Sequence, residues 1–84
     1  MTKEDLRTMF QENVNRSCDA PPELCETLKN VNSMAYKLRG TMMVNCADSH
    51  ELTTAIRRVH EGSMCFHDAL VQAAKHETQE AGAQ

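Results

Sequence analysis

Two heptad patterns of apolar residues occupy residues 24–73, LCETLKNVNSMAYKLRGTMMVNCADSHELTTAIRRVHEGSMCFHDALVQA. The first pattern consists of Leu24, Leu28, Val31, Ala35, Leu38 and Met42. The second follows the polar break at 45–49 and consists of Leu52, Ile56, Val59, Ser63, Phe66, Leu70 and Ala73. Spacings of three and four residues are typical of helices that pack along a seam. The two helices are therefore predicted to form an antiparallel hairpin joined by a short turn.

A third, shorter helix is predicted before the hairpin. Thr2 and Asp5 have the spacing of a helix N-cap and its acidic partner, and one face then carries Leu6, Met9, Phe10 and Val14. Pro21 and Pro22 interrupt the pattern, because proline cannot continue the hydrogen bonds of a helix. The sequence predicts a single all-α domain with helices at about 3–15, 21–44 and 49–76 and a tail at 77–84.

The small size of the chain favours self-association. A domain of 84 residues buries only about 60% of the surface that its unfolded chain exposes, and this chain has only three aromatic residues. Each hairpin helix also carries apolar or small residues off the seam, which one partner helix cannot cover: Cys25, Met34, Met43, Ala55, Met64, Cys65 and Ala69. These second stripes imply another copy of the chain, and so a homo-oligomer.

The four cysteines, Cys18, Cys25, Cys46 and Cys65, are interpreted as free thiols. The first residues, MTKEDLRTMF, lack the apolar segment of a secretory signal, so reduced thiols in a cytosol are expected. A zinc site could be drawn from Cys46 and His50, or from His60, Cys65 and His67. Positions 60 and 65 lie about 140° apart on a helix, however, and do not converge on one ion. We predict no metal and no cofactor.

Histidine and cysteine side chains on the last helix are also the only candidates for catalysis. A cysteine beside a histidine can form an activated thiolate, and His60 and His67 share one face with Cys65 nearby. No acidic residue stands at a helical spacing that would orient both, and no glycine-rich turn accompanies them. The sequence therefore predicts a protein that is not an enzyme.

Charge is concentrated in the middle of the chain. Residues 1–28 have a net charge of −3, residues 29–58 of +3 and residues 59–84 of −3. Long nucleic acids are bound through many phosphate contacts along an extended cationic surface, which this distribution does not offer. A small anion needs only a few cations, so the basic middle is either a small-anion site or a solvated helix face. No stretch approaches the roughly 18 apolar residues of a membrane span, so no membrane association is predicted.

The segment from Cys46 to Leu70 resembles the turn and second hairpin helix of the phage anti-CBASS cyclic-oligonucleotide sponges, a hairpin also found in anti-Thoeris sponges. The similarity rests on the Cys-x-Asp-Ser turn at 46–49 and on Glu51, Thr53, Ala55, Glu61, Met64, Ala69 and Leu70. Pro22-Glu23 and a helix ending near Val44 match the first hairpin helix. The resemblance covers about two thirds of the chain.

The resemblance implies a function as well as a fold. It implies a homohexamer in the cytoplasm of an infected bacterial host, which binds cyclic di- or trinucleotides such as 3′,3′-cGAMP without cleaving them. Sequestering these second messengers would block CBASS-type signalling and let the phage evade immunity. No long nucleic acid and no membrane is implied as a partner.

The resemblance also implies ligand-binding residues. The family's phosphate-binding lysine falls on Lys29 when the pattern is anchored at Pro22-Glu23, and on Asn32 when it is anchored at Cys46. Phe10 is the nearest candidate for the family's base-stacking aromatic residue, which is a tyrosine there. His67 stands where the family has a small polar amide, and Gln72 replaces an arginine associated with trinucleotide binding.

A second class of function stays open at this stage. The apolar stripes and the basic middle also fit a small helical regulator that binds another protein. In that case Phe10 belongs to the core, Lys29 is solvated and His67 lies in an interface.

Overall fold

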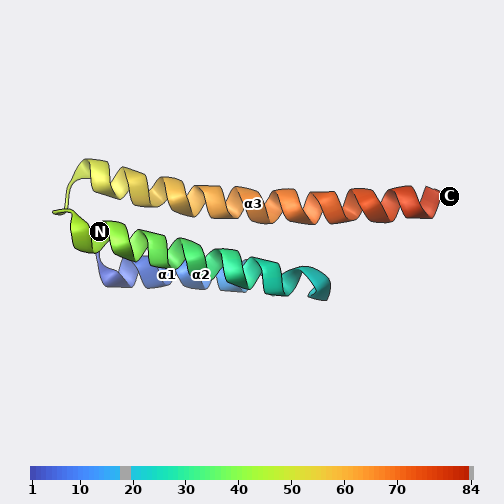
Figure 1. The fold of residues 1–84 in the computed structure, drawn as a ribbon, viewed down its shortest axis with the longest axis horizontal. Coiled ribbons are helices and arrows are strands. Elements are labelled where there is room, and N and C mark those ends of the chain that lie inside the picture. The colour runs from blue at the N-terminus through green and yellow to red at the C-terminus, as the bar shows by residue number, and fades with distance from the viewer. Residues whose placement is uncertain (18–19, 84) are drawn as a thin grey trace.

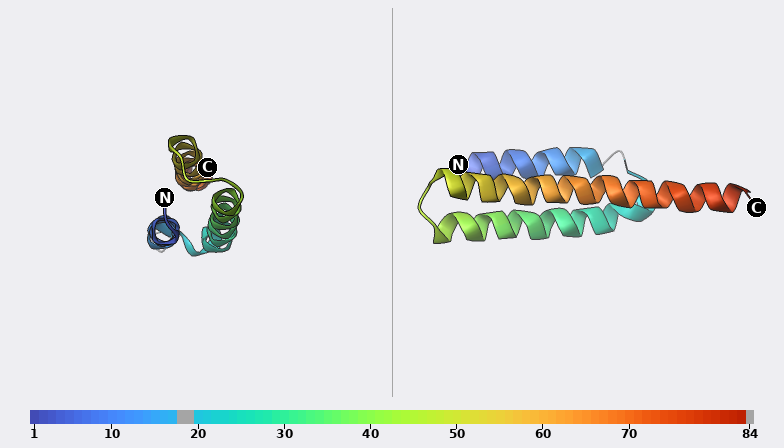
Figure 2. Two further views of the ribbon diagram at one scale, coloured as in Figure 1. Left: turned by 90° about the vertical axis from the view of Figure 1, so that its left-hand side faces the viewer. Right: turned by 90° about the horizontal axis from the view of Figure 1, so that it is seen from above.

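The all-α prediction is confirmed by the structure, a computed structural model that describes residues 1–17 and 20–83, with side chains as far as His76. The helices are α1 (Lys3–Ser17), α2 (Pro22–Asn45) and α3 (His50–Ala83). Figure 1 shows α2 and α3 side by side and antiparallel, with α1 behind α2. Viewed along the helices, the three lie at the corners of a triangle (Figure 2). The direction of α1 is that of α3, so α2 runs opposite to both.

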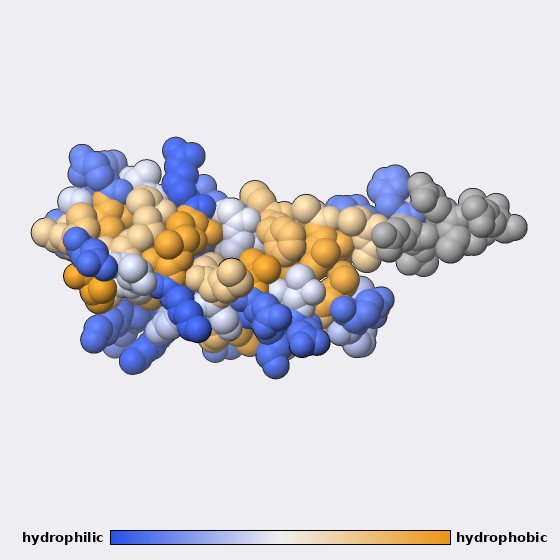
Figure 3. Space-filling model, in the orientation of Figure 1, coloured by the Kyte–Doolittle hydropathy of each residue, from blue (hydrophilic) through white to orange (hydrophobic). Residues whose placement is uncertain are grey.

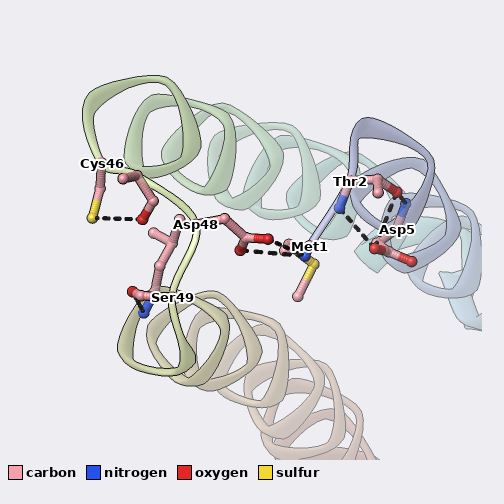
Figure 4. A network of polar contacts seen from close by, with 8 residues as sticks. Met1, Thr2, Asp5, Cys46, Asp48 and Ser49 are labelled. Atoms are coloured by element: carbon pink, nitrogen blue, oxygen red, sulfur yellow. Dashed lines mark hydrogen bonds and ion pairs between the residues drawn. The ribbon is translucent and has the colours of Figure 1, made fainter.

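Polar side chains cap the helix starts, as the sequence indicates. The backbone N–H of Thr2 donates to the Asp5 carboxylate at 2.7 Å, and the Asp5 N–H donates to the Thr2 hydroxyl at 3.2 Å (Figure 4). The backbone N–H of Leu52 donates to the Ser49 hydroxyl at 3.1 Å and so caps α3. Pro22 takes the first position of α2, where its missing N–H costs no hydrogen bond. The sequence also offers Asp19 as a cap of α2, but Asp19 lies outside the described residues, and α2 begins after Pro21 with no hydrogen bond from a capping side chain among those described.

The predicted tail at 77–84 is wrong for residues 77–83, which continue α3 to Ala83. The loss of the apolar period near Lys75 was interpreted as the end of the helix. Residues 75–81 are nevertheless rich in alanine, glutamate, glutamine and lysine, which favour helix without any packing partner. The end of apolar packing and the end of the helix are therefore separate positions in this chain.

The buried face of α2 is rotated about the helix axis relative to the predicted seam. Leu28 and Ala35 are buried as expected, but Asn32 and Arg39 take the inner positions in place of Val31 and Leu38. Leu38 is 51% exposed. The prediction treated the hairpin helices as an isolated pair, whereas α1 also packs against α2. The inner face of α2 therefore lies between its two neighbours.

The buried face of α3 is likewise rotated about the helix axis relative to its predicted seam. Phe66, a predicted seam residue, is 39% exposed, while the side chain of the adjacent His67 is only 15% exposed and faces α1. An apolar cluster lies at the end of the bundle near the α2–α3 turn, where Leu6, Leu52 and Ile56 are buried, and Leu28 and Ala35 are buried apart from it along α2. Around this cluster pack Met1, Met9, Tyr36, Met42 and Met43.

Between this core and the far end, the interior is polar. Asn13 on α1 donates to the Ser63 hydroxyl on α3 at 3.1 Å, and the Ser17 hydroxyl donates to the Asn13 carbonyl at 2.8 Å. At the surface Arg16 pairs with Asp68 at 2.6 Å. Since α1 buries Asn13 and Ser17 besides Leu6, hydrogen bonds and ion pairs contribute much of its attachment to α3.

The chain is elongated, with extents of 56 × 19 × 14 Å. Its accessible surface is 5975 Å², whereas a compact monomer of 9.4 kDa exposes about 5,000 Å². No helix in the described ranges 1–17 and 20–83 combines the length and apolar character that crossing a membrane requires.

Candidate functional site

A groove between α1 and α2 contains the largest number of the predicted site residues. One of its cavities, here called the Lys29 hollow, has a volume of about 280 Å³. α3 contributes no lining residue. The hollow is lined by Phe10, Val14, Ser17, Cys25, Lys29, Asn32 and Ser33. Phe10 of α1 thus lies beside Lys29 and Asn32 of α2, the two alternatives for the family's phosphate-binding lysine.

Phe10 lies in the middle of this groove. Its ring meets that of Tyr36 on α2 edge to face, with ring centroids 5.0 Å apart and an angle of 65° between the planes. Both side chains are half-buried. Sequence reasoning treated Tyr36 only as core material. The seven-residue spacing from Lys29 to Tyr36, which puts both on one face of α2, was a signal that could have placed it here.

Lys29 is exposed at the edge of the hollow, and it makes no hydrogen bond or ion pair with the described part of the chain. Ser33 follows it by one helical turn and also lines the hollow. An unpaired ammonium beside an apolar cavity attracts an anionic group while the cavity holds an apolar one. This arrangement suits a ligand with both characters.

Asn32 is buried at the inner edge of the hollow. Its side-chain amide donates to the backbone carbonyl of Phe10 at 3.3 Å and so ties α2 to α1. Its side-chain oxygen is buried without a hydrogen-bond partner among the described residues. The amide thereby positions Phe10, while the oxygen is enclosed by the protein.

His67 and Gln72 do not join this site. Nε2 of His67 lies 3.3 Å from the carbonyl oxygen of Arg16, and because a carbonyl only accepts, Nε2 carries the proton. Nδ1 of His67 lies 3.5 Å from the Asp68 carboxylate. Gln72 is exposed on α3. Both residues are on α3, which does not line the Lys29 hollow, but His67 lines a small interior cavity of about 10 Å³ together with Asn32.

A second group of polar residues lies between α1 and α3. His60 approaches Glu12 to 3.0 Å there, and Nδ1 of His60 is buried without a partner in the described part of the chain. These residues border a separate cavity between α1 and α3, which has a volume of about 440 Å³. It is lined by Met1, Asp5, Thr8, Met9, Glu12, Thr53, Arg57, His60 and Glu61. Hydrogen bonds from the backbone and the hydroxyl of Thr2 lower the pKa of Asp5. No three potential metal-ligating side chains of the described residues gather at one point.

Among the basic residues of 29–58, Arg39 differs most from the expectation of a small-anion site or a solvated helix face, because it is buried. Lys29, Lys37, Arg57 and Arg58 are exposed, but Arg39 is 0% exposed. All three guanidinium nitrogens lack a hydrogen-bond partner among the described residues. Burial lowers the pKa of Arg39, and the nearby Tyr36 acts in the opposite direction. Position 39 falls on the inner face of α2, which the periodicity of the apolar residues did not reveal.

No protein-family profile, no curated protein and no solved structure matches the chain. The similarity to cyclic-oligonucleotide sponges therefore depends on the residues quoted for it. The function has to be argued from the groove.

Proposed function

We propose that the protein binds and sequesters cyclic di- or trinucleotides, such as 3′,3′-cGAMP, without cleaving them, and so blocks CBASS-type signalling in the cytoplasm of an infected bacterium. The observation that carries the proposal is that Phe10 of α1 lines one hollow with Lys29 of α2, and with Asn32, the alternative to Lys29 for the family's phosphate-binding lysine.

The chemistry of the hollow fits a nucleotide. An exposed, unpaired Lys29 offers a cation for a phosphate, and Phe10 offers an aromatic edge and apolar contact for a base. Asn32 acts indirectly, because its side-chain amide holds the backbone of Phe10 at the edge of the hollow.

The size of the hollow supports an assembled form. Its volume of about 280 Å³ is at the lower limit of ligand pockets, which measure about 300–1,000 Å³. A cyclic dinucleotide carries two bases and two phosphates, so part of it would extend beyond this hollow. We propose that a second copy of the chain covers the remainder, within a homohexamer.

Surface properties also support assembly. The chain exposes about 1,000 Å² more than a compact monomer of its mass, which is close to the roughly 800 Å² that each partner buries in a stable interface. Met34 is 69% exposed and Leu38 51% exposed. Figure 3 shows apolar side chains along the face formed by α2 and α3, with hydrophilic groups at its margins.

Calorimetry tests the proposal directly. The full chain is titrated with a panel of cyclic di- and trinucleotides, and the bound ligand is recovered after denaturation and analysed. We expect heat from at least one cyclic nucleotide, recovery of that ligand intact, and affinity at least about tenfold weaker in Lys29→Gln. Lys37→Gln, which removes an exposed cation of α2 outside the groove, is the matched control.

Three results would contradict this function. Absence of heat for every member of the panel removes the sponge function, and recovery of linear nucleotide makes the protein an enzyme. Equal affinities for Lys29→Gln and Lys37→Gln remove Lys29 from the site.

A second candidate function, a regulator that binds another protein, is favoured by the exposed Met34 and Leu38. It would use the α2–α3 face instead of the groove. A chain that stays monomeric by light scattering and gives no heat with cyclic nucleotides would favour this candidate.

A further inference from the structure

A second cavity occupies the same α1–α2 groove on the other side of the Phe10–Tyr36 contact. This cavity, here called the Arg7 hollow, has a volume of about 300 Å³. Like the Lys29 hollow, it is lined by α1 and α2 alone. Its lining residues are Lys3, Leu6, Arg7, Tyr36, Gly40, Met43 and Val44.

The charged lining of the Arg7 hollow is entirely cationic. Lys3 and Arg7 are exposed, and neither makes a hydrogen bond or an ion pair with the described residues. They are four residues apart, so both lie on one face of α1, where like charges at this spacing repel each other. An anion between them would remove that repulsion and would find two donors.

Gly40 lines the Arg7 hollow and has no side chain. A Cβ atom built on Gly40 would have no other atom within 4 Å, so close packing does not require glycine here. Glycine within a helix costs about 1 kcal/mol relative to alanine. Gly40 thus lines the hollow beside Tyr36 without adding a side chain to it.

Arg39 adds positive charge near this part of the hollow. It directly precedes Gly40 in the chain, and its electrostatic interaction with Tyr36 places the two side chains near each other. A buried guanidinium without a partner contributes a field that water screens little. Lys3, Arg7 and Arg39 therefore make this end of the groove favourable for a negative group.

The two hollows have complementary positions along α2. From Lys29 to Gly40 is eleven residues, or about 16 Å of helix, and long lysine and arginine side chains at both ends can reach toward the centre. Phe10 and Tyr36 lie between the hollows. The groove thus has a cation at one end, two aromatic rings in the middle and two exposed cations at the other end.

We propose that the Arg7 hollow is a second phosphate subsite, with Lys3 and Arg7 as its ligand-binding residues. Lys3 and Arg7 extend from it along the groove toward one phosphate of a cyclic oligonucleotide while Lys29 extends toward the next, because only six bonds separate neighbouring phosphorus atoms of such a ring. This inference rests on the proposed function and goes beyond it, because it makes the presence of two phosphates the feature that the groove selects. A nucleotide with one phosphate fills only one end.

The experiment compares three probes on four proteins. The probes are 3′,3′-cGAMP, GMP as a single-phosphate nucleotide, and inorganic pyrophosphate. The proteins are the wild type, Lys3→Gln/Arg7→Gln, Lys29→Gln, and the control Lys37→Gln/Arg58→Gln, which removes two exposed cations outside both hollows. Far-UV circular dichroism and thermal unfolding establish that each variant keeps the fold.

We expect Lys3→Gln/Arg7→Gln to weaken 3′,3′-cGAMP binding by at least about tenfold and GMP binding by less than about twofold, because GMP can use the Lys29 end alone. Lys29→Gln should weaken the binding of both nucleotides. The control should change neither by more than about twofold. If Lys3→Gln/Arg7→Gln binds 3′,3′-cGAMP as the wild type does, the subsite is overturned and the sponge function stands.

The measurements with pyrophosphate distinguish failure of the phosphate subsite from failure of the sponge function. If the wild type binds no cyclic nucleotide, the sponge function fails, and the Arg7 hollow is judged by pyrophosphate alone. Weaker pyrophosphate binding in Lys3→Gln/Arg7→Gln than in the control then supports an anion site. Equal binding in these two variants overturns it.

Discussion

The ring of Phe10 on α1 packs edge to face on the ring of Tyr36 on α2, with centroids 5.0 Å apart. The Lys29 hollow and the Arg7 hollow lie on either side of this pair, because Phe10 lines the first and Tyr36 the second. One aromatic contact therefore both joins the two helices and divides the groove.

Phe10→Leu is expected to weaken cyclic nucleotide binding by about tenfold, since stacking of a base on an aromatic ring contributes about 1–3 kcal/mol. Leucine keeps apolar volume, so the fold should persist. Phe66→Leu makes the same change at an aromatic residue of α3 outside the groove and serves as the control, with affinity close to that of the wild type. Calorimetry measures both, and equal affinities for the two variants would contradict a stacking role for Phe10.

Arg39→Met is expected to increase stability by about 1–4 kcal/mol, because the native chain buries a guanidinium whose nitrogens have no hydrogen-bond partner among the described residues. Methionine has a similar length and no charge to desolvate. Urea unfolding measures the change, with Lys37→Met on the exposed face of α2 as the control. A loss of stability in Arg39→Met would show that the guanidinium is paired in the assembled protein.

Ile56→Ala is expected to cost about 2–5 kcal/mol, because Ile56 is 0% exposed and belongs to the only buried apolar cluster identified in the described residues. A domain of this size has little stability to lose. Val44→Ala removes an aliphatic side chain that is 74% exposed and should change stability by less than about 0.5 kcal/mol. Thermal unfolding that shifted equally in both variants would refute this placement of the core.

Removal of the cap at the start of α1 should change the response to acid. The Thr2 N–H and hydroxyl lower the pKa of Asp5, so the folded pKa is below the unfolded one. The stabilising contribution is present above the unfolded pKa of about 3.9 and is lost as the pH falls through the folded pKa.

Asp5→Asn is therefore expected to unfold more easily near neutral pH and to lose less stability than the wild type on acidification below about pH 4. Glu4→Gln removes the same charge from the neighbouring exposed residue and is the control. Urea unfolding across this pH range measures both. Parallel pH profiles for Asp5→Asn and the wild type would contradict a capping role for the carboxylate.

The exposed apolar face of α2 gives a test of assembly. Met34→Glu/Leu38→Glu places two charges on the proposed interface and should convert the oligomer to smaller species, as measured by light scattering. Gln11→Glu/Asn15→Glu adds the same charge, at the same four-residue spacing, to the exposed face of α1 and is the control. An unchanged mass for Met34→Glu/Leu38→Glu would exclude this face from the interface.

Local signals in the sequence predict much of the fold. The capping pair Thr2–Asp5, the helix break before Pro22 and the Ser49 cap of α3 involve residues close in the chain, so their physics can be evaluated from the sequence alone. The inner positions of Asn32 and Arg39 cannot be obtained in this way. They depend on where α1 packs, and heptad spacing describes only pairs of helices.

The candidate site also contains some residues that the sequence identifies and others that only the packing of the helices reveals. Phe10, Lys29 and Asn32 were identified by residue type and resemblance, and the packing of α1 on α2 brings them together. Lys3, Arg7 and Tyr36 were missed, because no sequence pattern relates the start of α1 to the second half of α2. His67 and Gln72 were included because the register of a family pattern does not determine which helix forms the groove.

The apolar core has a consequence for the chemical durability of the fold. Met1, Met9, Met42 and Met43 pack around Leu6, Leu52 and Ile56. Oxidation of such a thioether to the sulfoxide puts a polar, chiral group against aliphatic side chains. Peroxide should therefore loosen this end of the bundle at doses that a core of leucine would withstand. The integrity of the protein would then depend on methionine sulfoxide reduction as well as on temperature and denaturant.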